Sequence, residues 1–248
     1  VEGGDPIPAA GRLAALLLRD AGDACPSGVD LLALAAWLDL PGIPYALFAE
    51  GATLLPPRLR QACGDTDAVR AAALELQKRR LARCGPVLFC VHPVVAAALR
   101  ASATREQQEG LATTALRLVL ESFPVEEQYT HPLPACIDRL AHGYAATDHT
   151  EGLGIQKSRT AQMLHTLGLY LHGCHDLAAA ETCYARAVRL TEQAQGAASP
   201  VLAARVNNRG VVLRQLKRFD AARDCFQRAL DICERLPASE RSRALAPA

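Results

Sequence analysis

Apolar residues recur at a long, fixed spacing in the second half of the chain. Residues 163–188 align with residues 205–230 at an offset of 42 residues, so that Gly168 pairs with Gly210. Within each copy, apolar positions follow helical spacing on both sides of a short polar turn. A long period with small and large residues in matching places is typical of a helical-repeat array. Such arrays present surfaces for binding and seldom carry chemistry.

Each copy predicts a pair of helices. The expected helices of the array are 159–172, 177–194, 200–216 and 219–236. Short turns, 173–176 and 217–218, join the two helices of each pair. We expect residues 237–248, which are mostly Ala, Ser, Arg and Pro, to form a frayed tail.

The first half of the chain predicts shorter helices and one strand. The helices are expected at 13–20, 29–38, 45–51, 66–82, 94–100, 104–123 and 135–146. Residues 41–44 are read as a turn, 56–57 as part of an irregular stretch, and 124–134 as a loop. The run 87–91, Val-Leu-Phe-Cys-Val, is β-branched and aromatic, and therefore predicts a strand that closes a small hairpin at Cys84–Pro86.

These elements predict a mostly α fold in four parts. Residues 1–101 form a winged-helix-like domain, because three helices, a hairpin and a further helix follow in order. Residues 102–150 form a helical hairpin that does not match the repeat and acts as a cap, with a polar, Gly-rich connector and hinge over 147–156. Residues 151–236 hold two repeats of an α-solenoid, and 237–248 form the tail.

Composition removes several functional classes. The chain has 248 residues, half of them apolar, and a net charge of +1, so no global field recruits nucleic acid or membrane. No apolar run approaches the roughly 18 residues that span a bilayer. The sequence begins at Val1 rather than Met, and we expect it to be a piece of a longer protein or a processed product.

Nine cysteines are scattered along the chain without any CxxC pair. This usage fits reduced thiols in a cytoplasmic protein better than a disulfide or zinc framework. Cys174 and His175 lie close to His172 and could suggest a metal site. A polar turn between two repeat helices explains the same residues, and we favour that interpretation.

The repeats resemble the tetratricopeptide repeat. The matching residues of the first copy are Leu164, Leu167, Gly168, Leu171, Ala180, Tyr184 and Ala187; those of the second are Val206, Gly210, Leu213, Ala222, Phe226 and Ala229. Gly168 and Ala180 would let two helices approach closely, while the aromatic residues fill space toward the next unit. Arg209 departs from the motif where leucine is usual. The period of 42 and the Asn207–Asn208 pair are similar to the kinesin-light-chain type of repeat.

The resemblance implies a concave groove, lined by the first helix of each pair, that binds a protein or peptide. Its expected polar residues are Gln162, His165, Thr166, His172, Asn207, Asn208, Arg214 and Gln215, with Leu169 and Val211 between them. Asparagine amides can pair with the backbone of an extended peptide without reading its sequence. Alternatively, they bond only to water or to the neighbouring helix.

The first hundred residues resemble the winged-helix domain of STAND signalling ATPases of the NB-ARC type. The residues that carry this resemblance are the runs 31–38, 43–48 and 89–95. In many bacterial members this domain precedes a helical hairpin and 42-residue tetratricopeptide repeats, the order predicted here. The resemblance implies a regulatory and sensor fragment in bacterial defence or signalling, with an NTPase module upstream as its partner.

His92 occupies the place of the family's Met-His-Asp histidine, within Val91-His92-Pro93. In the family this histidine contacts the β-phosphate of bound ADP and holds the inactive state. The aspartate of the motif is missing here. Alternatively, His92 only caps the helix that starts at Pro93. ADP or ATP is thus implied for the full-length protein, and no cofactor is expected in this chain alone.

Catalytic signatures are absent from the sequence. There is no GxxxxGK[ST] loop to hold nucleotide phosphates, no GxSxG and no HExxH. We therefore predict that this chain is not an enzyme. The basic cluster Lys78-Arg79-Arg80 with Arg83 could suggest DNA contact. The preceding helix carries Asp67 and Glu75, and we interpret the cluster as a solvated face.

Two other interpretations remain open. The chain could be the regulatory part of a bacterial transcriptional activator that joins the same switch and repeats to a DNA-binding domain. It could also be a stand-alone tetratricopeptide adaptor with no link to nucleotide.

Overall fold

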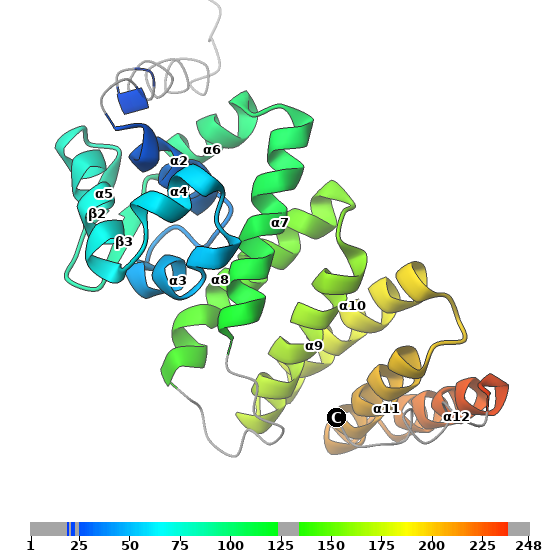
Figure 1. Cartoon of the computed structure of the whole chain (residues 1–248). Helices are drawn as coiled ribbons and strands as arrows, with labels where there is room; N and C mark the ends of the chain where they lie inside the picture. Colours follow the sequence, from blue (N-terminus) through cyan, green and yellow to red (C-terminus); the bar gives the residue numbers. More distant parts are fainter. Residues whose placement is uncertain (1–18, 20, 23–24, 124–133, 238–248) are drawn as a thin grey trace, which may run out of the picture. The chain divides into compact units, whose positions relative to one another are not determined.

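The computed structural model describes residues 19, 21–22, 25–123 and 134–237 (Figure 1). Most of the helix predicted at 13–20, the loop predicted at 124–134 and almost all of the tail lie outside these residues. The chain divides into two compact units, Val1–Phe123 with Ala141–His149, and Pro124–Leu140 with Thr150–Ala248. The fold is mostly α, as predicted, with one small antiparallel sheet. No helix of the described residues is long and apolar enough to cross a bilayer.

The helices of the first unit surround a small core. They are α2 (Pro26–Ala35), α3 (Tyr45–Glu50), α4 (Pro57–Ala62), α5 (Thr66–Lys78), α6 (Pro93–Ser102) and α7 (Arg105–Ser122), with a 3-10 turn, η1, at Ala52–Leu54. The irregular stretch predicted through 56–57 ends at Pro56, and the prediction missed α4, which begins at Pro57. Pro57 lies at the first turn of α4, where a missing N–H costs nothing. Helix α5 stops at Lys78, earlier than predicted, because Ala82 already belongs to a strand.

The sheet has three strands in the order β1-β3-β2: β1 (Ile43–Pro44), β2 (Ala82–Cys84) and β3 (Leu88–Val91). Cys84 pairs with Phe89 in the β2–β3 hairpin, which confirms the predicted hairpin. Strand β1 lies within the segment that we read as a turn. Phe89 is fully buried and stacks on Tyr45, with ring centroids 5.7 Å apart.

Helix α8 runs from Pro134 to Leu153, seven residues beyond its predicted end. Residues 147–153 of the predicted connector are therefore helical, and the boundary between the two compact units, after His149, falls within the range predicted as a hinge. The Thr147 hydroxyl donates to the carbonyl of Tyr144, and the Thr150 hydroxyl lies 2.9 Å from that of Thr160. Because both threonines are buried and bonded, their polarity does not end the helix. Residues 154–156, with left-handed Gly154, form the link to the next helix.

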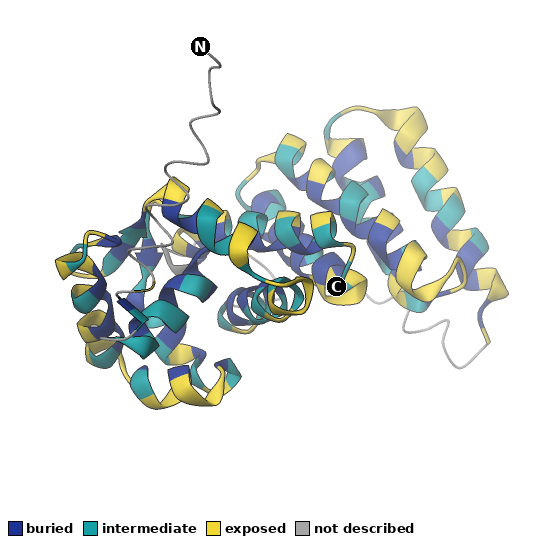
Figure 2. Cartoon of the chain, turned by 90° about the horizontal axis from the view of Figure 1, so that it is seen from above, coloured by how far each residue is buried: buried dark blue, intermediate teal, exposed yellow. Residues whose placement is uncertain are grey.

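The second unit contains the array: α9 (Lys157–Gly173), α10 (Leu177–Gln195), α11 (Pro200–Gln215) and α12 (Phe219–Arg235). These bounds confirm the predicted helices to within about two residues at each end. Figure 2 shows that buried residues run along the sides on which these helices face one another. Asp176 and Ser199 cap α10 and α11 by accepting from the backbone N–H groups of Ala179 and Leu202.

The glycine and aromatic positions that recur in both repeats set the distance between the paired helices. A Cβ on Gly168 would lie 2.7 Å from Cε1 of Tyr184, and one on Gly210 would lie 2.8 Å from Cε1 of Phe226. Each ring thus lies against the glycine of its own pair, rather than only toward the next unit as we expected. Close helix packing in each repeat requires both members of this glycine–aromatic pair.

Candidate protein-binding surface

The predicted polar residues of the groove lie on the first helix of each repeat. Helix α9 carries Gln162, His165, Thr166 and His172, and α11 carries Asn207, Asn208, Arg214 and Gln215. Gln162, Asn207, Arg214 and Gln215 are exposed, whereas His165, His172 and Asn208 are half-buried. The exposed members offer amide and guanidinium groups, which can bond to a peptide backbone or to carboxylates.

Two predicted site residues meet across the repeats. Nε2 of His172, near the end of α9, lies 3.0 Å from Oε1 of Gln215, at the end of α11. Since the imidazole can donate to this oxygen, the Gln215 amide nitrogen stays available on the surface. The bond fixes the C-terminal ends of α9 and α11 next to each other.

Three other predicted residues, Thr166, His165 and Asn208, have polar atoms that are covered by the protein. The Thr166 hydroxyl donates to the Gln162 carbonyl at 3.2 Å and is mostly buried. The His165 ring packs on Tyr184, with centroids 5.5 Å apart. Nδ1 of His165 and Nδ2 of Asn208 are both buried without a hydrogen-bond partner. These three side chains shape the surface from below, while contact falls to the exposed residues.

A buried arginine that the sequence analysis did not single out lies beneath this surface. Arg205 of α11 is only 6% exposed, and its guanidinium donates to the Thr191 hydroxyl of α10. Burial lowers the Arg205 pKa to about 10. Burial also lowers the His165 pKa to about 4, with a smaller contribution from the nearby Arg205 charge. His165 is therefore neutral near pH 7.

Arg209, which departs from the repeat motif, forms an ion pair with a residue of the preceding repeat. Its Nε and a terminal nitrogen lie 2.9 and 2.7 Å from Oε1 of Glu181 on α10. Glu181 is largely covered, at 16% side-chain exposure. Helix α8 is joined to α10 in the same way, because Glu151 pairs with Arg186 and Arg189. The sequence did carry a signal for the Arg209–Glu181 pair. An arginine stands where the repeat motif usually has leucine, and a glutamate lies 28 residues earlier.

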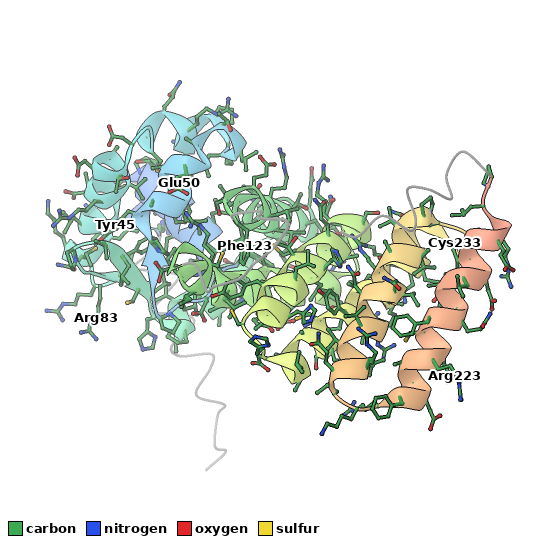
Figure 3. All side chains as sticks on the ribbon, turned by 90° about the horizontal axis from the view of Figure 1, so that it is seen from below. Tyr45, Glu50, Arg83, Phe123, Arg223 and Cys233 are labelled. Atoms are coloured by element: carbon green, nitrogen blue, oxygen red, sulfur yellow. The ribbon has the colours of Figure 1, made fainter. Side chains whose placement is uncertain are left out.

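His92 caps α6, as the local alternative proposed. Its Nδ1 accepts from the backbone N–H of Val94 at 3.2 Å. The exposed ring also lines a depression of about 640 Å³ beside the hairpin, with Gln77, Arg80, Arg83 and Cys90 among its other residues. Figure 3 shows Arg83 projecting from the hairpin. The capping bond uses Nδ1 of the ring.

No cluster of three or more His, Cys, Asp or Glu side chains suited to a metal ion occurs within the described residues. The turn predicted at 173–176 is confirmed by the helix bounds, because Cys174 and His175 follow α9 and Asp176 caps α10. His175 adopts a left-handed backbone, with φ of 63°. This conformation of His175 belongs to the turn that joins α9 and α10.

The tetratricopeptide repeat family model matches residues 159–243. This match confirms the family predicted for the array, and it covers about a third of the chain. No curated protein matches the chain, and no solved structure matches it. The second unit thus carries tetratricopeptide repeats, a module whose general role is to bind proteins or peptides, as argued above from its surfaces.

Proposed function

We propose that the repeats receive a protein or peptide ligand on the face formed by α9 and α11. The observation that carries this proposal is the bond between His172 and Gln215, which holds the two first helices side by side with Gln162, Asn207 and Arg214 exposed on them. These groups supply hydrogen bonds and one positive charge, which suits an extended peptide with a carboxylate.

Substitution of the exposed groups tests this surface. We expect Asn207→Ala with Arg214→Ala to weaken a selected peptide at least tenfold, because two polar contacts worth about 1 kcal/mol each are lost. The ligand can be selected from a displayed peptide library on the full chain and measured by fluorescence anisotropy. Gln193→Ala is the matched control, since Gln193 is an exposed polar residue on the second helix α10. Equal losses in both proteins would contradict the assignment of the face.

We further propose that the chain is a regulatory part of a STAND-type NTPase, in which a winged helix relays nucleotide state from an upstream module. The order of helices, hairpin, further helices and repeats supports this, together with the position of His92 at a depression that contains two arginines. Ligand binding on the repeats would then shift the balance between inactive and active states through its different affinity for each. A transcriptional activator with the same parts is the alternative.

Two substitutions at His92 separate capping from nucleotide contact. Asparagine is a strong N-cap residue, so His92→Asn is expected to keep the cap of α6 while it removes the ring nitrogen Nε2. In the full-length protein we expect His92→Asn to lose retained ADP at a stability close to that of the wild type, whereas His92→Ala loses both. If His92→Asn retains ADP as well as the wild type, the histidine acts as a cap alone and the adaptor interpretation gains support.

A further inference from the structure

The turn between α11 and α12 differs in charge from the matching turn of the first repeat. Residues 214–224 hold four Arg or Lys and two Asp, which gives a net charge of +2. Residues 172–182, which lie 42 positions earlier, hold no Arg or Lys and two carboxylates, which gives −2 with histidine counted as neutral. The charge at this place is therefore reversed between the two repeats.

Three exposed cations of this turn have no ion-pair partner among the described residues: Arg214, Lys217 and Arg218. The fourth cation, Arg223, holds both carboxylates of the range, since Asp220 and Asp224 lie 3.3 and 3.9 Å from it. Helices α9 and α11 contain no aspartate or glutamate. The turn therefore keeps a positive charge that its surroundings do not neutralise.

Arg218 also deprives α12 of the cap that α10 has. Asp176 is the N-cap residue of α10, and its carboxylate accepts from the backbone N–H of Ala179. Arg218 holds the same place before α12, with φ of −88° and ψ of 67° against −81° and 73°, and makes no capping hydrogen bond. A positive charge is unfavourable there, because the helix dipole is positive at the N-terminus. Local stability favours an aspartate at this position and does not explain the arginine.

An exposed aromatic side chain follows these cations directly. Phe219 is 65% exposed, whereas the matching Leu177 of the first repeat is half-buried. Aromatic and arginine side chains are enriched where proteins bind one another. We define the turn face by its three cations and this ring: Arg214, Lys217, Arg218 and Phe219.

We propose that the turn face binds a short acidic segment of a partner protein. The carboxylates of this segment pair with the three cations, and an apolar side chain between them packs on Phe219. Arg214 is shared with the predicted groove, but Lys217, Arg218 and Phe219 lie outside it. The turn face is thus a second protein-binding surface of the array, and it does not require the groove to bind a peptide.

Charge distinguishes this occupant from others. Residues 238–248, which follow α12, hold two arginines and one glutamate, so they do not complement the turn face. A nucleic acid strand carries negative charge along its whole length and is met by cations spread along a track. The turn face gathers its cations within five residues, 214–218, and a short acidic segment matches that extent.

Two labelled peptides provide the probes. One has the sequence Gly-Glu-Glu-Leu-Glu-Glu-Gly, and the other has glutamine in place of each glutamate. Fluorescence anisotropy with the full chain should show at least about tenfold tighter binding of the acidic peptide, because only its carboxylates pair with the cations. Equal affinity for the two peptides would overturn the proposal.

Arg218→Asp separates binding from stability. We expect it to weaken the acidic peptide about tenfold, while it supplies the missing cap and raises the unfolding temperature of the repeat unit by about 4 °C. Phe219→Ala should weaken the same peptide about threefold, because the leucine loses its contact. Arg235→Asp is the matched control, since it makes the same change of charge at an exposed position about 25 Å away, at the other end of α12. It should leave the affinity nearly unchanged.

Several results would assign the peptide to another place. Binding that survives Arg218→Asp, or that Arg235→Asp weakens as strongly, would overturn the proposal. Binding that Asn207→Ala weakens tenfold would overturn it in favour of the groove. A rise in affinity after Glu126→Gln with Glu127→Gln would overturn it in favour of an acidic segment of the chain itself.

Two further results would replace the partner by another macromolecule. Tighter binding of an oligothymidylate strand than of the acidic peptide, lost in Arg218→Asp, would overturn the proposal in favour of nucleic acid. Self-association of the wild-type chain that Arg218→Asp removes would overturn it in favour of a second copy.

Discussion

Replacement of Gly168 by alanine is expected to lower the free energy of unfolding of the repeat unit by about 2 kcal/mol. The new Cβ would lie 2.7, 2.9 and 3.1 Å from three atoms of the Tyr184 ring. Tyr184 is fully buried, so its ring cannot swing away. The clash costs about 3 kcal/mol, and the higher helix propensity of alanine returns about 1 kcal/mol. Thermal unfolding followed by circular dichroism should show a fall of roughly 10 °C.

Alanine substitutions at two other helix glycines, Gly210 and Gly152, provide comparisons for the loss of stability expected in Gly168→Ala. In Gly210→Ala the Cβ meets Phe226 at 2.8 Å, but that ring is half-buried and can tilt outward, so we expect about half the loss. A Cβ on Gly152 in α8 has no neighbour within 4 Å, and Gly152→Ala should stabilise by about 0.5 kcal/mol through helix propensity. Equal stability of the Gly168 and Gly152 variants would contradict the close packing of α9 on α10.

The same glycine–aromatic pairs show why the array could be predicted so closely. A residue of fixed size recurs at each close contact, and the contacts lie within one helix pair, so the sequence period carries the packing directly. Boundaries in the first unit were less predictable. Whether Ala82 ends α5 or pairs as β2 depends on Val91, which lies nine residues away and is brought beside it by the hairpin. Ile43 likewise becomes a strand only because Phe89 lies opposite it.

Polar residues misled the prediction at α8. Thr147 and Thr150 suggest a connector, but their hydroxyls are satisfied by Tyr144 and Thr160, and the second bond requires α9 to be in place. For the candidate surface, helical spacing placed Gln162, Asn207 and Arg214 on the correct helices. It could not show that Thr166 is buried, or that Arg209 pairs with Glu181, because both depend on neighbouring helices.

Replacement of Arg205 by methionine is expected to stabilise the repeat unit by about 1–2 kcal/mol. Arg205 is buried, and its Nε has no hydrogen-bond partner. Among the described residues its guanidinium contacts the neutral hydroxyl of Thr191 and forms no ion pair with a carboxylate. The residue 42 positions earlier is Met163, which is fully buried, so a side chain of this shape already fits the repeat. Thr191 keeps its own bond to the Ala187 carbonyl at 2.6 Å.

The neighbouring Arg209→Met is the matched control with the opposite expected sign. It lies on the same helix, one turn further, but its removal strands the largely covered Glu181 carboxylate. We expect a loss of about 1–2 kcal/mol there. Chemical denaturation measures the free energy of unfolding of both variants. The comparison holds when the dependence of this free energy on denaturant concentration has the same slope as in the wild type. If both variants lose stability, Arg205 is compensated by a contact other than Thr191.

His165 supplies an independent readout of the buried Arg205 charge. Its folded pKa of about 4 lies below the ordinary value of 6.5, so between these pH values the unfolded chain binds the proton and the folded chain does not. Stability of the repeat unit therefore falls as pH drops from 6.5 toward 4, and is unaffected by this group above that range. Arg205→Met removes one of the two causes, so the His165 pKa should rise while burial keeps it below 6.5. NMR titration of the His165 ring would measure this rise, and the acid-induced loss of stability should shrink with it.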